Sequence, residues 1–139
     1  MPRLSTWLVR ASLICLVAGA LLGAALLSSP AVPALRGLER LVAAHVELML
    51  VGWLMQLAMG VAYWILPRAG GKRPAGGLAA AGAAGVAAGL AAAVAGTVTH
   101  APALVTAGRG LEAVGAALFG LHVVIRLERW RRLAAERLS

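Results

Sequence analysis

The stretch that decides the fold runs from Arg40 to Arg68 and reads RLVAAHVELMLVGWLMQLAMGVAYWILPR. It is almost entirely apolar between Leu41 and Leu66 and closes at Pro67-Arg68. A membrane-spanning helix needs about 20 consecutive, mostly apolar residues, whereas a buried helix of a soluble protein is usually shorter. The stretch therefore predicts a transmembrane helix over residues 41–66.

Three further apolar runs satisfy the same length criterion, at about 11–28, 76–98 and 103–125. The connectors between the four runs are short, which favours antiparallel neighbours. We therefore expect an all-α fold, an integral membrane four-helix antiparallel bundle that forms one membrane domain over residues 1–139. Residues 126–139 form its basic tail.

The composition agrees with a membrane protein. Of the 139 residues, 61% are hydrophobic and 13% are charged, against about a quarter charged in soluble domains. Lys and Arg exceed Asp and Glu by 13 to 5, which gives a net charge of +8. Because these charges lie at the ends of apolar runs, we attribute them to membrane topology and expect no nucleic-acid partner.

The distribution of basic residues predicts the orientation. The N-terminus, the second loop and the tail would share one side of the membrane, which then holds Arg3, Arg10, Arg68, Lys72, Arg73, Arg126, Arg129, Arg131, Arg132 and Arg137. The other side holds Arg36, Arg40 and Arg109. Positive charge gathers on the cytoplasmic side. We therefore expect both termini in the cytoplasm and the chain in the inner (plasma) membrane of a bacterial or archaeal cell.

Ionisable residues inside a span need a reason, because each costs about 2.5–3.5 kcal/mol on insertion scales. His45 lies about four residues into its span, roughly 6 Å below the outer boundary, whereas His122 lies near the inner end of the fourth span. The hydrocarbon core is about 30 Å thick, so these two cannot share one haem iron. His45 and His100, in the outer loop, can. His45 can also pair with its copy in a dimer or with a His of another subunit.

Further residues complete this candidate site. Helical spacing places Gly52, Gln56 and Tyr63 on the face of His45, where Gly52 would leave space for a cofactor. Arg40 and Arg109 lie at the outer level and suit the carboxylates of haem propionates.

Other polar and small residues have simpler interpretations. Arg109 and Glu112, at i and i+3, are most simply a mutual salt bridge, and we interpret His122 as interfacial. Ala81, Gly85, Gly89 and Ala93 recur every four residues in the third span, a pattern typical of close helix packing.

The stretch from Arg40 to Arg68 also resembles the second transmembrane helix of the catalytic subunit of heme–copper oxidases, in particular the C-family oxidases and nitric oxide reductases. The matching features are Arg40, His45, Gly52, Gly60, Tyr63-Trp64 and Pro67-Arg68. The resemblance implies that His45 binds haem b near the outer face. The family's second axial His and its metal-binding His cluster have no counterpart in this sequence, so we expect no reduction of oxygen or nitric oxide by this chain alone.

Two functions stay open on the sequence. In the first, the chain is a small b-type cytochrome-like subunit that carries haem b on His45 and transfers electrons within a respiratory membrane complex. Its expected partners are the bilayer, other membrane subunits or a second copy, and quinone or a periplasmic electron carrier. In the second, it is a haem-free accessory subunit of a respiratory or photosynthetic complex. A His45 ring that points into lipid or is clasped by a backbone carbonyl, with no porphyrin within bonding reach, would leave this second function as the surviving one.

Overall fold

The computed structural model describes residues 2–66 and 76–136, which form helices and turns without any strand. Four helices, of 26, 28, 23 and 35 residues, are long and apolar enough to cross a membrane. They are α1 (Arg3–Ser28), the segment Leu38–Ile65, α4 (Gly76–Val98) and α5 (Pro102–Glu136). The all-helical, four-helix expectation is confirmed, and each helix contains nearly all of its predicted apolar run. Arg68, Lys72, Arg73 and Arg137 lie outside the described residues.

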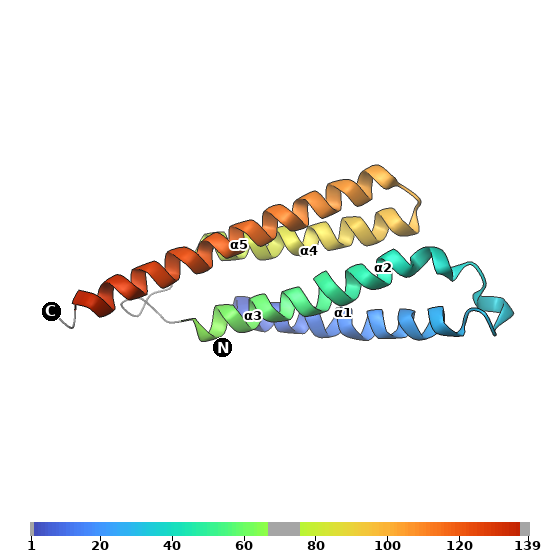
Figure 1. Ribbon diagram of the computed structural model, residues 1–139, viewed down its shortest axis with the longest axis horizontal. Coiled ribbons are helices and arrows are strands. Elements are labelled where there is room, and N and C mark those ends of the chain that lie inside the picture. The colour runs from blue at the N-terminus through green and yellow to red at the C-terminus, as the bar shows by residue number, and fades with distance from the viewer. Residues whose placement is uncertain (1, 67–75, 137–139) are drawn as a thin grey trace.

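The helices lie side by side as two antiparallel hairpins (Figure 1). One hairpin joins α1 to Leu38–Ile65 through the short 3₁₀ helix η1 (Pro33–Leu35), and the other joins α4 to α5. The first helix begins and α5 ends at the same end of the bundle (Figure 1). The hairpins meet mainly where α4 packs against Leu38–Ile65.

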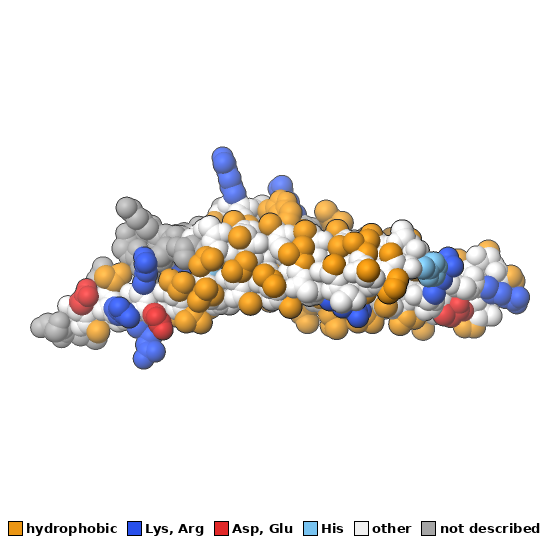
Figure 2. Space-filling model, turned by 90° about the horizontal axis from the view of Figure 1, so that it is seen from above, with side chains coloured by type: hydrophobic (Ala, Val, Ile, Leu, Met, Phe, Trp, Pro, Cys, Tyr) orange, Lys and Arg blue, Asp and Glu red, His pale blue; other side chains and the backbone are white. Residues whose placement is uncertain are grey.

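The surface of the bundle is apolar along its middle. Figure 2 shows hydrophobic side chains over the central part of one face, with most charged side chains towards the two ends. Large apolar side chains are exposed on every helix, among them Ile14, Leu21, Leu50, Val98 and Val114. Water disfavours such a surface over this area, whereas lipid tails do not.

The second helix is not a uniform α-helix. It consists of the 3₁₀ turn η2 (Leu38–Leu41), α2 (Val42–Glu47), the π-helical segment η3 (Leu48–Met55) and α3 (Gln56–Ile65). A π-helix is wound by i→i+5 hydrogen bonds, so the side chains that follow it are rotated relative to those of an unbroken α-helix. As a result, His45 faces α1 whereas Tyr63 stacks against His122 of α5. Tyr63 therefore does not lie on the face of His45 as expected, whereas Gly52 faces α1 as His45 does, against Cys15.

Glycines bring α1 close to the second helix. The two helices run antiparallel in a constant register that sets Gly23 beside His45, Gly19 beside Met49, Cys15 beside Gly52 and Leu8 beside Gly60. At each level one partner is a glycine, which leaves room for the other side chain. Ser5 adds a hydrogen bond of 2.7 Å from its hydroxyl to the carbonyl oxygen of Gly60.

The contact between α4 and α5 is the most extensive in the molecule. A Cβ at Gly89 would lie 2.6 Å from the carbonyl oxygen of Gly108, and one at Gly115 would lie 2.6 Å from the amide nitrogen of Val86. Only glycine permits backbones to approach so closely. Of the predicted small-residue repeat, Gly85, Gly89 and Ala93 take part and Ala81 is exposed. The contact continues instead at Gly82 and Gly96.

His100 ends α4 through its backbone. Its φ of 56° is left-handed, and the amide of Ala101 donates a 2.8 Å hydrogen bond to the carbonyl oxygen of Gly96. This is the Schellman pattern, with His100 at the position that usually holds glycine. Pro102 then starts α5, where its missing N–H costs nothing.

The fourth predicted span and the tail form one helix. The 35 residues of α5 extend about 52 Å at 1.5 Å per residue, well beyond a hydrocarbon core of about 30 Å. The helix therefore continues without a break from the predicted span through Glu136. Its last turns project past the other helices at the end of the bundle (Figure 1).

The α4–α5 contact predicts opposite effects for two neighbouring glycines. A Cβ at Gly108 would lie 2.6 Å from the amide nitrogen of Ala93, whereas one at Gly110 would meet nothing within 4 Å. Alanine favours an exposed helix by about 0.5–1 kcal/mol over glycine, and overpacking costs about 1–3 kcal/mol. We expect Gly110→Ala to preserve or raise the melting temperature in detergent, followed by circular dichroism, and Gly108→Ala to lower it. Equal effects would contradict this packing.

Candidate functional site

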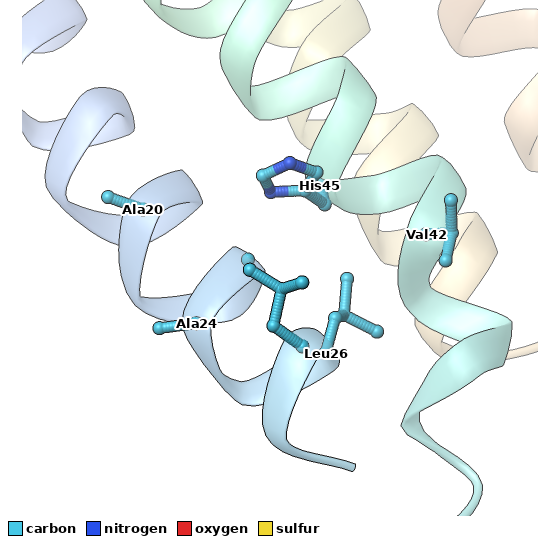
Figure 3. Close-up of a pocket in the computed structure, with 7 residues that line it drawn as sticks. Ala20, Ala24, Leu26, Val42 and His45 are labelled. Carbon is cyan, nitrogen blue, oxygen red and sulfur yellow. The ribbon is translucent and has the colours of Figure 1, made fainter. Parts of the chain in front are cut away.

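His45 lies between α2 and α1, with its ring directed at the α1 backbone (Figure 3). Its Nδ1 is 2.9 Å from the carbonyl oxygen of Gly19. The edge of the ring fills the notch at Gly23, where a Cβ would lie 2.7 Å from the Cε1 of His45. The two α1 glycines, at i and i+4, thus form a seat for one imidazole.

The hydrogen bond fixes the chemistry of the ring. A carbonyl oxygen only accepts, so Nδ1 is the donor and carries the hydrogen. In the neutral imidazole, Nε2 then bears the lone pair that binds a metal. Metal-bound histidines usually donate their second ring N–H to a carbonyl or carboxylate in this way. The same bond, however, also satisfies a purely structural histidine.

An apolar groove of about 580 Å³ begins at the His45 ring. Its walls are Ala20, Gly23, Ala24, Leu26 and Leu27 of α1 with Val42 of α2. Figure 3 labels Ala20, Ala24, Leu26 and Val42 near the imidazole. This volume is within the range of small-molecule and cofactor sites. One nitrogen donor on an apolar wall fits one axial side of a haem. The groove is open, so a planar group here would be covered on its other face by something else.

His100 is not brought to this groove. It lies exposed in the turn between α4 and α5, and this hairpin lies on the side of α2 away from α1 (Figure 1). The ring of His45 faces α1 instead. Among the described residues, no three His, Cys, Asp or Glu side chains gather in a way that would hold a metal ion.

Gly52 does not open the space that its spacing suggested. A Cβ there would lie 2.8 Å from the Cβ of Cys15 and 3.1 Å from Leu90, so both neighbours already fill the gap. The glycine that makes room beside His45 is Gly23 of α1, whereas Gly19 makes room for Met49 and offers His45 its carbonyl oxygen. The spacing of four residues between these two glycines was the signal in the sequence, but it acquires meaning only once α1 is known to face His45.

The two arginines proposed for propionates differ in their environment. Arg40 is exposed in η2, one turn before α2. Arg109 is already engaged, because its Nε donates a 2.8 Å hydrogen bond to Oε1 of Glu47. The expected salt bridge with Glu112 is replaced by this pairing between α5 and α2, which the i, i+3 spacing within α5 could not reveal.

A second polar cluster lies at the opposite end of the bundle. His122 is fully buried against Tyr63 and Phe119, with ring centroids 5.5 and 5.9 Å away, so its ring packs between helices. The buried Arg126 donates to the carbonyl oxygens of Tyr63 and Leu66. It thereby caps the C-terminal end of α3, where a cation also meets the negative end of the helix dipole.

Comparison with known proteins adds no relative to this picture: no family model, no curated protein and no solved structure matches the chain.

Proposed function

We propose that this chain is a small b-type cytochrome-like subunit that binds haem b through His45 and passes single electrons within a respiratory membrane complex. One observation carries the proposal. The His45 ring lines an apolar groove, and the 2.9 Å hydrogen bond of its Nδ1 to the Gly19 carbonyl oxygen leaves Nε2 of the neutral ring with the lone pair that binds a metal. The resemblance of Arg40 to Arg68 to an oxidase helix points to the same residue.

The proposal includes a position in the membrane. The chain crosses the inner membrane of a bacterial or archaeal cell four times, with both termini in the cytoplasm. Support comes from four helices of sufficient length and hydropathy and from the excess of Lys and Arg at the end where α1 begins and α5 ends. His45 then lies in the outer half of the bilayer.

A partner chain completes the haem site. His122 is buried at the far end of the bundle, and His100 lies on the α4–α5 side of α2, so neither reaches the groove between α1 and α2. The sixth ligand therefore comes from another membrane subunit or from His45 of a second copy. The open side of the groove is where such a partner would contact the cofactor.

The residues of this chain would do three things for the cofactor. His45 supplies an axial nitrogen, the apolar groove lowers the local dielectric, and Arg40 offers an exposed guanidinium for a propionate. Haem b supplies reversible one-electron chemistry when bound. Quinone or a periplasmic electron carrier would be the redox partner, and the chain alone would catalyse no reaction.

A second function is favoured by the same seat of His45. The Gly19 hydrogen bond and the Gly23 notch also account for the ring without iron, and the exposed apolar faces suit contact with other membrane helices. On this account the chain is a haem-free accessory subunit of a respiratory or photosynthetic complex. Absorption spectra separate the two functions.

The haem proposal predicts the colour of the purified protein. We expect a Soret band and a sharp reduced α-band of b type, both lost in His45→Ala. His100→Gly is the matched variant, because glycine suits the left-handed position of that turn, and it should keep the full spectrum. Loss of haem in His100→Gly would contradict the partner-chain ligand. A folded, colourless protein that takes up no added haem would leave only the accessory role.

The close contact between Gly23 and the His45 ring predicts a second substitution that reduces haem binding. In Gly23→Ala the new Cβ would lie 2.7 Å from Cε1 of His45, so the ring must turn away from its seat. We expect reduced haem occupancy per chain, measured as the ratio of Soret absorbance to protein. Gly110→Ala, on an open face of α5, should bind haem normally. Unchanged occupancy and spectrum in Gly23→Ala would count against this seat.

The orientation is tested with reporter fusions. A fluorescent protein that matures only in the cytoplasm should be active at the C-terminus. Alkaline phosphatase, which needs the periplasm, should be active when inserted in the turn at residues 33–37. The reverse pattern would show that the distribution of basic residues misassigns the membrane sides.

A further inference from the structure

Two carboxyl groups and one guanidinium meet where α2, α4 and α5 pack together. Glu47 of α2 is 9% exposed and Glu112 of α5 is 7% exposed. Arg109, one turn before Glu112, binds Glu47 through Nε at 2.8 Å. The Arg109 side chain is 56% exposed, so this residue lies partly at the outer surface of the bundle while the two carboxyl groups are buried.

Glu112 has the less favourable position of the two acids. Its side chain packs on α4, where a Cβ at Gly89 would lie 2.7 Å from its Cγ. Its Oε1 is buried and has no hydrogen-bond partner among the described residues. Helix α4 carries no ionisable side chain between Gly76 and Val98 that could pair with Glu112. The charges that act on Glu112 are the negative charge of Glu47 and the positive charge of Arg109.

The number of charges in this cluster determines which of the two carboxyl groups is protonated. With both acids ionised, the cluster holds two negative charges and one positive charge in a region of low dielectric. An unpaired buried carboxylate is strongly disfavoured there, and a buried acid takes up a proton instead. Glu47 has the direct hydrogen bond to Arg109, so the proton belongs on Glu112.

We propose that Glu47, Arg109 and Glu112 form a one-proton binding site, in which Glu112 carries the proton and Glu47 stays ionised against Arg109. The site is then neutral overall. It gives the chain a carboxylic acid that can release and take up a proton inside a membrane-spanning helix. The inference is independent of haem, because it uses neither His45 nor the groove at its ring.

A hydrophobic carbodiimide, dicyclohexylcarbodiimide, is the probe. A protonated carboxyl adds across the carbodiimide, the acid proton passes to a carbodiimide nitrogen and no group leaves. An acyl shift from oxygen to nitrogen then gives a stable N-acylurea. The full chain in detergent is treated at neutral pH and mapped by mass spectrometry. We expect the adduct on Glu112 and not on Glu47 or the exposed Glu39.

Variants of Glu47 and Arg109 distinguish a proton that depends on the three-residue cluster from a Glu112 that reacts only because the reagent can reach it. Glu47→Gln removes the competing acid, so Arg109 can pair with Glu112 at i, i+3 and ionise it. Labelling of Glu112 should fall several-fold. Arg109→Gln removes the shared cation, and labelling should then spread to Glu47. Glu128→Gln, in the exposed last turns of α5, should change nothing.

The test needs no substitution of Glu112, because the labelled residue is identified in the wild-type chain. Helical circular dichroism and a single elution peak establish that each variant is folded. An unlabelled Glu112 in the folded wild type would overturn the proposal. So would unchanged labelling of Glu112 in Glu47→Gln, because the proton would then not depend on the competition for Arg109.

Discussion

Close approach of helix backbones at glycine is the constraint on which the rest of this structure depends. Lipid tails are as apolar as leucine, so burial of apolar surface gives little drive for helices to associate inside a bilayer. Association must come from close packing and from polar contacts. Gly89, Gly108 and Gly115 supply the closest approaches between α4 and α5. Between α1 and the second helix, Gly19 and Gly23 instead make room for the side chains of Met49 and His45. The carbonyl oxygen of Gly19 and the notch at Gly23 form the seat of His45.

The polar contacts join the two hairpins at both ends. Arg109 binds Glu47 at the end that holds His45, and Arg126 caps the carbonyls at the end of α3. Each contact brings α5 to the second helix, which α5 otherwise meets little. Between them lies the π-helical segment Leu48–Met55. This segment rotates α3 relative to α2, so that His45 can face α1 while Tyr63 faces α5.

Much of the fold could be predicted because span length and hydropathy are properties of a single helix. Helix rotation is not such a property. These helices are apolar on nearly all sides, and periodicity therefore gives little indication of which face is buried. For that reason the sequence located the repeat of Gly85, Gly89 and Ala93 but included Ala81, which faces outward. It placed His122 near the inner end of the fourth span but did not reveal that the ring is fully buried against Tyr63 and Phe119.

The candidate site, like the fold, could be predicted only where a feature depends on a single helix. His45 could be selected from the sequence because a polar imidazole is costly inside a membrane span and therefore indicates a specific role. Its contacts could not be predicted, because Gly19 and Gly23 lie on another helix, α1. Arg109 was assigned to Glu112 by spacing within one helix, whereas the folded chain offers it Glu47 across the bundle. The π-helical segment has no sequence signal that would have revealed it.

The central claim is that Nε2 of His45 bonds to haem iron, and pulsed electron paramagnetic resonance of the ferric protein tests it most directly. The protein is produced with ¹⁵N-histidine in the His100→Gly background, which leaves His45 and the buried His122 as the labelled rings. The account predicts a low-spin ferric signal with a ¹⁵N coupling typical of an iron-bound imidazole. A ferric haem signal without that coupling would contradict it.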